Sequence, residues 1–216
     1  MKAVLTTKKV IIFDFDGVLA DSFDYLYSLI KDGMKHIGLS FTKDQYRDLF
    51  IGNIHQGFKN FINDEIKYPA FAEFRKANFD RNYYNEERGV KLFPEAPAFL
   101  KKISKKYILT IASSGQKITL ETLLKKNRIR SLFSLILANT ATTKEETMKE
   151  ILNKFRVNPR QTFFITDTVG DIKAAKKIGL KTIAVTWGFH NINYLVTAKP
   201  DNIASSFKIL ESMLQK

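Results

Sequence analysis

Short apolar runs alternate with amphipathic segments along most of the chain. The runs consist of four to six Ile, Val, Phe or Leu residues between polar residues or glycine, a pattern typical of strands buried on both faces. Strands that alternate with helices pair in parallel through right-handed crossovers, so the pattern predicts an α/β fold with a doubly wound parallel sheet. The expected strands lie in residues 8–16, 107–115, 134–139, 161–168 and 180–188, and the expected helices span 95–106, 116–128, 144–156 and 170–179.

The segment from Ser22 to about Gly89 breaks this alternation, because it contains no convincing strand. Its many aromatic and aliphatic residues recur at helical spacing, which predicts an all-helical insertion of about four helices. The insertion follows the first strand directly and is therefore expected over the carboxyl edge of the sheet. We expect a core domain formed by residues 1–21 and 90–216 and a helical cap domain formed by residues 22–89. Two helix ends are also predicted, at Asn158-Pro159 and at Gly179.

Polar residues follow the expected strands at the ends where open α/β sheets bind their ligands. Carboxylates at close range repel each other unless a cation lies among them. A cluster of oxygen ligands without cysteine favours Mg²⁺ over zinc. The sequence therefore predicts a magnesium site at this edge. The residues at these strand ends are, in chain order, Asp14, Asp16, Ser113, Ser114, Lys144, Asp167 and Asp171.

Four segments resemble the ordered motifs of the haloacid dehalogenase-like (HAD) superfamily: DFDGVLADS, IASS, TTKEE and TDTVGDI. They occur in the order of those motifs and span essentially the whole chain. The helical block at 22–89 lies where the C1 cap lies in the branch of phosphoglycolate phosphatase and beta-phosphoglucomutase. The resemblance therefore implies a HAD Rossmann-like core with an alpha-helical C1 cap.

The resemblance also implies catalytic roles. Asp14 would be the nucleophile that forms an aspartyl-phosphate, and Asp16 would be the acid for the leaving group and then the base for water. Ser113 would hydrogen-bond the phosphoryl oxygens, while Lys144 would neutralise their charge. Covalent catalysis divides the displacement into two easier steps, and a cation and lysine let a carboxylate approach a phosphate. The implied Mg²⁺ ligands are Asp14, the backbone carbonyl of Asp16, Asp167 and, directly or through water, Asp171.

Four further residues are candidates for substrate contact. Gly17 permits a sharp backbone turn, so that amides near it can face the phosphate. Ser114 lies beside the expected phosphate ligand. Asn53 and His55 lie in the cap, in a segment that resembles a substrate-reading loop. His36 and His190 have no metal-ligand spacing and are expected to be structural or at the surface.

Three positions depart from the superfamily motifs. Thr166 stands where glycine often precedes the fourth-motif aspartate, residues 112–114 read Ala-Ser-Ser in place of the common Thr-Asn pair, and Glu145 in place of proline follows Lys144. None of these changes removes a reactive group. Because Asp16 is present, the pattern favours phosphate chemistry over dehalogenation, which needs no acid for the leaving group.

Each candidate also has a purely structural interpretation. Asp-Gly at 16–17 is a common turn dipeptide. Either serine of IASSG could cap the helix that follows it, and Asp171 could cap the next one. Lys144 could be a solvated lysine at a helix start. The occurrence of all four segments in one order favours the catalytic interpretation.

The chain of 216 residues is basic, with 35 Lys and Arg against 22 Asp and Glu, a net charge of +13. Residues 101–130 hold nine Lys or Arg and one acid. Phosphates or nucleic acid would be attracted to such a cluster. However, its lysines alternate with apolar residues, which favours the solvated faces of two helices flanking the sheet. We therefore do not expect a nucleic-acid partner.

The absence of cysteine excludes disulfides, thiolate zinc sites and a cysteine nucleophile, and it is compatible with the cytoplasm. No apolar stretch approaches the roughly 20 residues that cross a bilayer. The N-terminus is a poor signal peptide, because its short apolar run ends in acidic residues. We therefore expect a cytoplasmic protein without membrane association, either a monomer or a weak homodimer.

The expected function is that of a Mg²⁺-dependent phosphatase similar to phosphoglycolate phosphatase. Its partner would be a small phosphorylated metabolite, since a closing cap excludes bulky polymers. Two alternatives stay open. One is a phosphomutase of the beta-phosphoglucomutase type, although the segment after DFDGVLADS lacks the histidine expected in that type. The more remote one is a protein that binds nucleic acid or dephosphorylates its ends.

Overall fold

The computed structural model describes residues 9–79, 83, 89–138 and 142–215. The N-terminal segment considered above as a signal peptide, the residues just before Gly89 in the expected cap, and the last residue of the expected strand 134–139 lie outside this part. The exact bounds of the two domains therefore stay a prediction.

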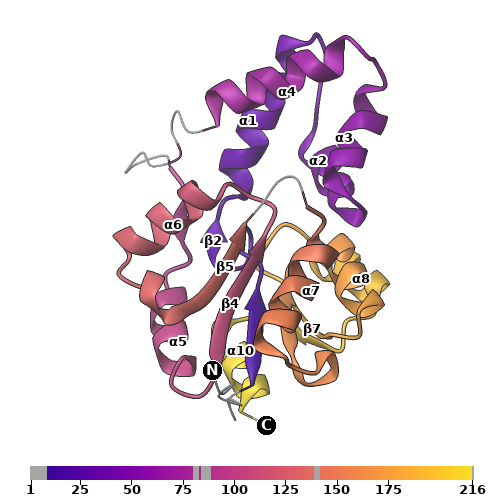
Figure 1. Ribbon diagram of the computed structural model, residues 1–216. Helices are drawn as coiled ribbons and strands as arrows, with labels where there is room; N and C mark the ends of the chain where they lie inside the picture. The colour runs from indigo at the N-terminus through magenta and orange to yellow at the C-terminus, as the bar shows by residue number, and fades with distance from the viewer. Residues whose placement is uncertain (1–8, 80–82, 84–88, 139–141, 216) are drawn as a thin grey trace.

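The core is a six-stranded sheet in which every neighbouring pair is parallel (Figure 1). Its strand order, β5-β4-β1-β6-β7-β8, places β1 in the middle, between β4 and β6, which lead to the segments IASS and TDTVGDI. The expected doubly wound α/β fold is confirmed. The strands are β1 (Val10–Phe13), β4 (Ile108–Ser113), β5 (Phe133–Ala138), β6 (Phe163–Thr166), β7 (Lys181–Val185) and β8 (Asn202–Ala204).

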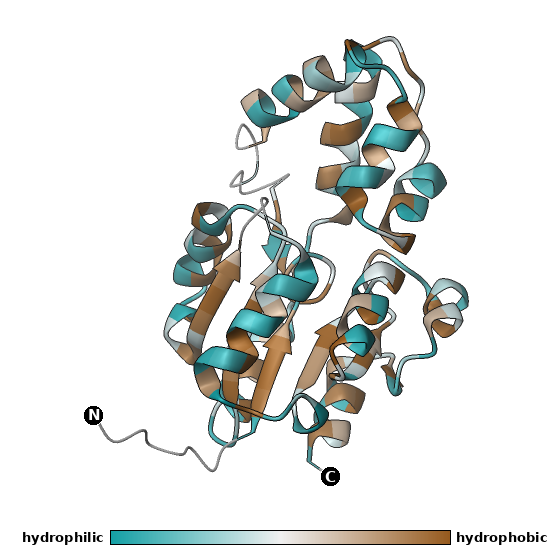
Figure 2. Cartoon of the chain, turned by 45° about the vertical axis from the view of Figure 1, so that its right-hand side comes forward, coloured by the Kyte–Doolittle hydropathy of each residue, from teal (hydrophilic) through white to brown (hydrophobic). Residues whose placement is uncertain are grey.

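Helices cover both faces of the sheet. Along β1 the side chains alternate between two apolar clusters: Ile11 and Phe13 pack with α5, α6 and α10, whereas Val10 and Ile12 pack with α7 and α8. All four are fully buried, which explains why the strand is apolar at every position. Figure 2 shows the same pattern, with strands hydrophobic throughout and helices striped. The helices are α5 (Ala96–Ile103), α6 (Lys117–Lys126), α7 (Lys144–Phe155), α8 (Val169–Lys177), α9 (Ile192–Leu195) and α10 (Phe207–Leu214).

A separate group of helices stands above the carboxyl edge of the sheet (Figure 1). These helices have their own apolar core, in which Met34, Phe58 and Phe71 are almost completely buried. Phe189 from the core joins this cluster and so connects the cap to the sheet. The cap elements are α1 (Phe23–His36), α2 (Lys43–Asp48), the 3-10 turn Leu49–Ile51, α3 (Ile54–Ile62) and α4 (Lys67–Asn78).

Several elements differ from the expectation. A two-stranded antiparallel sheet pairs β2 (Ala20–Asp21) with β3 (Lys91–Leu92), where the chain leaves and re-enters the core. Neither it nor β8 and α10 was predicted. Gly179 ends α8 in the left-handed region as expected, with φ of 80°. The helix before Asn158-Pro159 stops earlier than predicted, because Arg156 already adopts left-handed geometry with φ of 53°.

Within the described residues, no helix has both the length and the apolar character needed to cross a bilayer.

Candidate active site

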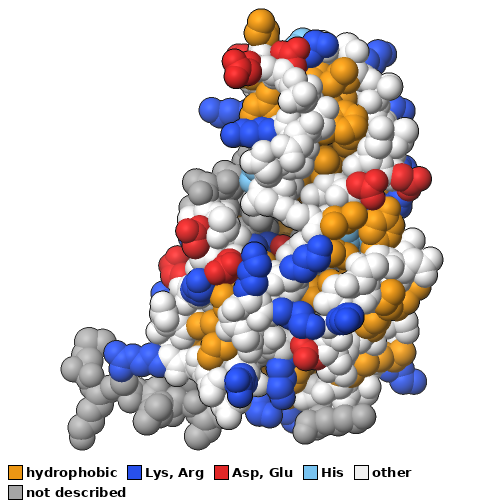
Figure 3. Space-filling model, turned by 90° about the vertical axis from the view of Figure 1, so that its right-hand side faces the viewer, with side chains coloured by type: hydrophobic (Ala, Val, Ile, Leu, Met, Phe, Trp, Pro, Cys, Tyr) orange, Lys and Arg blue, Asp and Glu red, His pale blue; other side chains and the backbone are white. Residues whose placement is uncertain are grey.

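A cavity of about 450 Å³ lies between the carboxyl edge of the sheet and the cap. Residues of both parts line it, so a ligand inside would contact the core and the cap together. Exposed lysines of α8, Lys173 and Lys177, lie along its wall. The surface on the α7 and α8 side accordingly carries a group of Lys and Arg side chains directly below the cap (Figure 3). Of the candidate residues, the cavity is lined by Asp14, Asp16, Asn53, His55, Ser113, Ser114, Lys144 and Asp171.

Lys144 is the first residue of α7, and it lies at the centre of the site. Its Nζ is 2.8 Å from Asp14 Oδ1 and 3.0 Å from Asp171 Oδ2, and it donates to the carbonyl of Ala112 at 3.1 Å. The helix begins there because Thr143 and Glu146 form a capping box. Only 10% of the lysine side chain is exposed, which excludes the solvated alternative.

The charges of this cluster are not balanced by the protein alone. Burial raises the pKa of Asp14 well above its ordinary value, and Lys144 offsets this only in part, because Asp171 and Asp167 add negative charge. Burial disfavours the charged form of Lys144, but the carboxylates of Asp14 and Asp171 outweigh that effect and raise its pKa. One lysine therefore faces three carboxylates. Such a site favours an added cation.

Asp167 follows β6 and is completely buried beside two glycines. Its Oδ2 accepts a hydrogen bond of 2.7 Å from the amide of Phe189. A Cβ at Gly17 would lie 2.0 Å from that same oxygen, and a Cβ at Gly188 would lie 2.3 Å from it. The two glycines thus allow backbone to enclose the carboxylate. Burial raises the pKa of Asp167 to about 7, although the hydrogen bond from the amide of Phe189 lowers it in part.

The donor set fits a magnesium ion. Asp167 Oδ1 is buried and has no hydrogen-bond partner among the described residues, which is costly unless a ligand satisfies it. No cysteine is available, and the candidate donors at the ends of β1 and β6 are carboxylate oxygens. Within the described residues, no three acidic or His side chains converge closely enough to ligate one ion. Backbone carbonyls and waters would have to complete the shell, which is usual for Mg²⁺.

Gly17 forms the sharp turn that follows Asp16. It adopts φ of 73°, so the sharp turn is present. Its amide, however, donates to the carbonyl of Ala20 at 2.8 Å, and the amide of Phe15 donates to Asp14 Oδ1 at 2.7 Å. Gly17 is also absent from the residues that line the cavity. The turn thus uses the amide of Gly17, and a side chain there would meet Asp167, whereas contact of Gly17 with the substrate stays a prediction.

Ser113, Gly115 and Asp16 lie close together at the ends of β1 and β4. Ser113 is 2% exposed, and its Oγ accepts a bond of 3.0 Å from the amide of Gly115, which leaves its hydroxyl hydrogen available to a ligand. Burial raises the pKa of Asp16. The nearby Ser22 and Lys144 lower this pKa, but their effect is smaller than that of burial. Neither serine caps a helix, since α6 begins after Gln116 without a side-chain cap.

The unusual threonine of the fourth motif has a structural explanation. Thr166 is fully buried, and its hydroxyl donates to Asp171 Oδ2 at 3.3 Å. Asp171 is the same residue that pairs with Lys144. Thr166 thus helps to hold Asp171 in place.

Asn53 and His55 bring the cap to the cavity. The side chain of Asn53 accepts a bond of 3.1 Å from the amide of Gln56 and so caps α3. The side-chain oxygen of Asn53 is therefore already engaged in capping this helix. His55 is half-buried, and burial lowers its pKa, with further lowering by the positive charges of Arg75 and Lys59.

The other two histidines differ in position: His190 is buried, and His36 is exposed on the cap. His190 is completely buried and joins core to cap: its Nδ1 accepts from the amide of Val169 at 3.0 Å, and its Nε2 lies 2.9 Å from the carbonyl oxygen of Arg47. This pattern requires a neutral ring with the proton on Nε2. Burial lowers the pKa of His190, consistent with that form. His36 stacks on Phe74 within the cap.

Backbone of the cap lies directly on the first turn of α8. A Cβ at Gly170 would lie 2.5 Å from the carbonyl oxygen of Gly52 and 2.9 Å from that of Phe50. Beside this contact, Lys173 Nζ is 3.4 Å from the carbonyl oxygen of Ile51. The cap is therefore in contact with the core next to Asp171.

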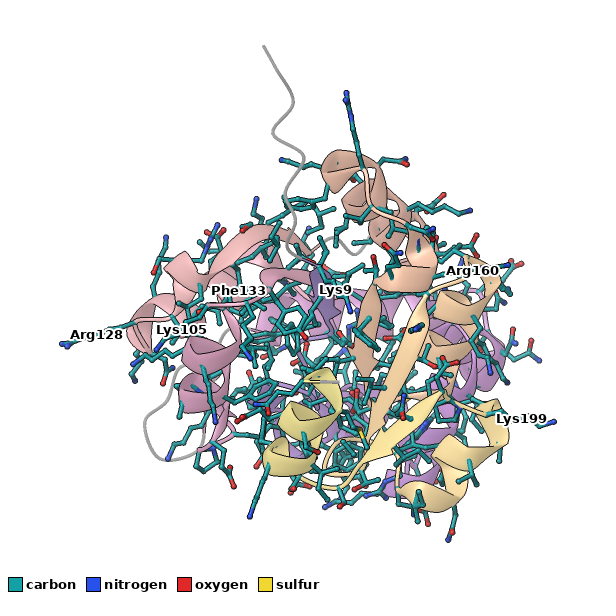
Figure 4. All side chains as sticks on the ribbon, turned by 90° about the horizontal axis from the view of Figure 1, so that it is seen from below. Lys9, Lys105, Arg128, Phe133, Arg160 and Lys199 are labelled. Carbon is teal, nitrogen blue, oxygen red and sulfur yellow. The ribbon has the colours of Figure 1, made fainter. Side chains whose placement is uncertain are left out.

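The basic residues of the segment 101–130 lie away from the cavity, which none of them lines. Lys105 and Arg128 point outward at the side of the core, as the view from the end opposite the cap shows (Figure 4). Several pair with acids: Lys102 with Glu211, and Arg130 with Glu121. This placement agrees with the solvated-face interpretation.

Some lining residues were not anticipated from the sequence, above all Tyr46 of α2 and Arg75 of α4. No motif marks them. Their positions in amphipathic helices gave no sign that these side chains would face a cavity.

Proteins of known function are similar to the chain over nearly its whole length. The phosphoglycolate phosphatase of Synechococcus elongatus is 27% identical over 199 residues, which cover 89% of this chain and 91% of the relative. The pyrophosphatase PpaX of Oceanobacillus iheyensis is 24% identical over 205 residues, covering 93% and 94% respectively.

The fold has equally close counterparts among solved structures. A haloacid dehalogenase-like family hydrolase from Streptococcus pneumoniae superposes with a TM-score of 0.83 at 24% identity, covering 96% of this chain and 99% of that one. The family model for the haloacid dehalogenase-like hydrolases matches residues 11–185, which include all four motif segments. The chain therefore belongs to the haloacid dehalogenase-like hydrolase family.

Proposed function

We propose that this hydrolase is a Mg²⁺-dependent phosphatase that cleaves a small phosphomonoester through an aspartyl-phosphate on Asp14. The observation that carries the proposal is the contact of Lys144 with Asp14 at 2.8 Å, in a cavity that Asp16 and Ser113 also line. A nucleophile, an acid, a hydroxyl donor and a cation thus face one space. This is the set that phosphoryl transfer needs.

The hydrogen bonds of Asp14 indicate which oxygen attacks. Lys144 and the amide of Phe15 both donate to Oδ1. Oδ2 is therefore the expected nucleophile: it forms the bond to phosphorus as the bond from phosphorus to the leaving oxygen breaks. Asp16 gives its proton to that oxygen, and its raised pKa favours the protonated form that this step needs. Water then attacks the aspartyl-phosphate and gives a proton to Asp16, which releases phosphate and restores Asp14.

The carboxylates of Asp14 and Asp167 are the residues that would hold the ion, with Asp171 beside them and the backbone carbonyl of Asp16 as a further oxygen. When bound, Mg²⁺ supplies positive charge that lets an anionic nucleophile approach an anionic phosphate. Lys144 supplies a fixed positive charge at the same place, and Ser113 orients the phosphoryl oxygens.

The substrate is expected to be small, because the cavity measures about 450 Å³ and the cap covers it. Several relatives are named for their action on phosphoglycolate, and one for its action on pyrophosphate. Phosphoglycolate is therefore the first substrate to test. The cytoplasmic location and the monomeric or weakly dimeric state stay predictions.

The experiment is to measure phosphate release from a panel of small phosphomonoesters and pyrophosphate, with Mg²⁺ and after chelation. We expect turnover of at least one compound, its loss by at least about 100-fold on chelation, and recovery when Mg²⁺ is restored. Undiminished turnover in chelator would contradict the role of the metal. Isomerisation of a sugar phosphate that depends on its bisphosphate, with slow release of phosphate, would instead support the phosphomutase alternative.

The contact between cap and α8 gives a second test. We expect Gly170→Ala to lower kcat/KM by a factor on the order of 10 to 100, because the new methyl group would displace the cap backbone from the site. The free energy of unfolding is expected to fall as well, because the displaced atoms are backbone and the preference of a helix for alanine over glycine, about 1 kcal/mol, offsets only part of that cost. Steady-state kinetics and urea unfolding measure the two effects.

Gly52→Ala is the matched control, because a Cβ at Gly52 would meet no atom within 4 Å. We expect it to keep nearly full activity. A Gly170→Ala enzyme as active as the wild type would show that catalysis does not require this contact.

A further inference from the structure

Arg75 places a positive charge in the cap wall of the cavity that holds Asp14. It lies on α4 and is half-buried. Its guanidinium carbon is 5.4 Å from the ring centre of Phe58 and 6.0 Å from that of Phe71, both of which are almost completely buried. The aromatic pair thus gives the flexible arginine side chain a fixed support.

The guanidinium has no polar partner in the part of the chain that the structure describes, since it makes neither a hydrogen bond nor an ion pair there. Burial lowers the pKa of Arg75, and the nearby tyrosines Tyr46 and Tyr68 only partly oppose this. Stacking on aromatic rings satisfies the face of a guanidinium but not its N–H donors. The N–H donors of Arg75 are therefore available to a ligand in the cavity that accepts hydrogen bonds.

Tyr46 provides an independent second observation on the same wall. It is 2% exposed and lines the cavity, and its hydroxyl makes no hydrogen bond within the described residues. Burial raises its pKa, and the charges of Asp16 and Asp167 raise it further. Tyr46 therefore holds a neutral donor near Arg75. Two donors that line the cavity and have no acceptor among the described residues favour a ligand rich in oxygen.

The cavity is thus polar at two places and apolar between them. Asp14, Lys144 and Ser113 lie at the sheet, Arg75 and Tyr46 lie in the cap, and apolar cap residues such as Leu26 and Ile30 line the remainder. A phosphomonoester whose phosphate lies at the sheet would extend its leaving group toward the cap. The planar fork of an arginine matches an oxyanion with two hydrogen bonds.

We propose that Arg75 recognises a second anionic group on the leaving-group side of the substrate, either a carboxylate or a second phosphate, with the Tyr46 hydroxyl as a supporting donor. This inference rests on the proposed function, because it takes the phosphate to lie at Asp14. It makes Arg75 the residue that selects small substrates with a second anionic group over alkyl phosphates whose leaving group is uncharged.

The experiment compares phosphoglycolate and pyrophosphate, which carry a second anion, with 2-hydroxyethyl phosphate, which does not. We expect Arg75→Gln to lower kcat/KM by roughly 10- to 100-fold for the anionic substrate that the wild type prefers, because a charged hydrogen-bonded pair is lost. The value for 2-hydroxyethyl phosphate is expected to stay within about 3-fold. Whether phosphoglycolate or pyrophosphate is affected more distinguishes a carboxylate from a phosphate.

Two variants serve as controls. Lys76→Gln removes the same charge from the next position of α4, where the side chain is exposed, and is expected to change neither value. Arg75→Lys keeps the charge and is expected to recover part of the loss. Equal losses on substrates with and without a second anion would mean that Arg75 only supports the cap, which would overturn the proposal. So would a wild type that shows no preference for a second anion.

Calorimetry at low temperature measures the binding of phosphoglycolate and 2-hydroxyethyl phosphate to the wild type and to Arg75→Gln. Because it does not depend on turnover, this measurement tests the inference separately from the proposed function. Failure of the wild type to hydrolyse any ester, p-nitrophenyl phosphate included, would contradict the proposed function. Selective weakening of phosphoglycolate binding by Arg75→Gln would support the role of Arg75 even then. Equal binding of phosphoglycolate by both proteins would overturn that role.

Discussion

Replacing Asp14 by Asn is expected to reduce phosphate release by at least about 10³-fold, because an amide cannot attack phosphorus as a carboxylate does. The substitution keeps the size of the side chain. It also keeps an oxygen that can accept the bonds from Lys144 and the amide of Phe15. The loss is therefore expected in kcat with the fold intact. Steady-state phosphate release and circular dichroism measure the two properties.

Asp32→Asn is the matched control for this substitution, since Asp32 lies exposed on α1 in the cap. It makes the same chemical change and is expected to leave turnover unaltered. Retention of more than about a tenth of the wild-type rate by Asp14→Asn would contradict a nucleophilic role for Asp14.

Gly17→Ala is expected to lower the free energy of unfolding by roughly 2 to 5 kcal/mol. Part of this loss comes from placing a Cβ at φ of 73°, which costs about 1–2 kcal/mol. The remainder comes from the methyl group, which would lie 2.0 Å from Asp167 Oδ2 and 2.8 Å from the ring of Phe189 and must displace them. Because Asp167 belongs to the proposed metal site, Mg²⁺-dependent activity is expected to fall as well. Urea unfolding gives the energy.

Gly38→Ala isolates the conformational part of that effect. Gly38 has φ of 76°, almost the same as Gly17, but a Cβ there would meet no atom within 4 Å. We expect it to lose about 1–2 kcal/mol and to keep its activity. Equal destabilisation by the two substitutions would mean that Asp167 moves aside without cost, which would contradict a tightly enclosed carboxylate.

The sheet was predictable from the sequence because its central strands are buried on both faces. Ile11 and Ile12 point to opposite sides of β1, and helices cover both, so the run is apolar throughout. The strands β2 and β3 contain two residues each and leave no periodic pattern. β8 was missed because a three-residue strand carries too little pattern, and its pairing with β7 depends on the folded sheet.

The core side of the candidate site was predictable for a related reason. Parallel strands bring their carboxyl ends to one edge, so Asp14, Ser113 and the residues after β6 had to lie near one another. The cap side was not predictable in this way. A helical pattern identifies the apolar face of α4 but does not tell whether Arg75 faces water or a cavity. The packing of Gly17 against Asp167 also depends on contacts between segments about 150 residues apart in sequence.

The most direct test of the central claim is to trap the phosphoryl group on the enzyme. The protein is mixed with its best substrate and Mg²⁺, quenched in acid and reduced with borohydride, which converts an aspartyl-phosphate to homoserine. Peptide mass spectrometry then locates the change. We predict homoserine at position 14, present only when substrate was added. Homoserine at another aspartate, or an enzyme in full turnover without any such residue, would contradict Asp14 as the nucleophile.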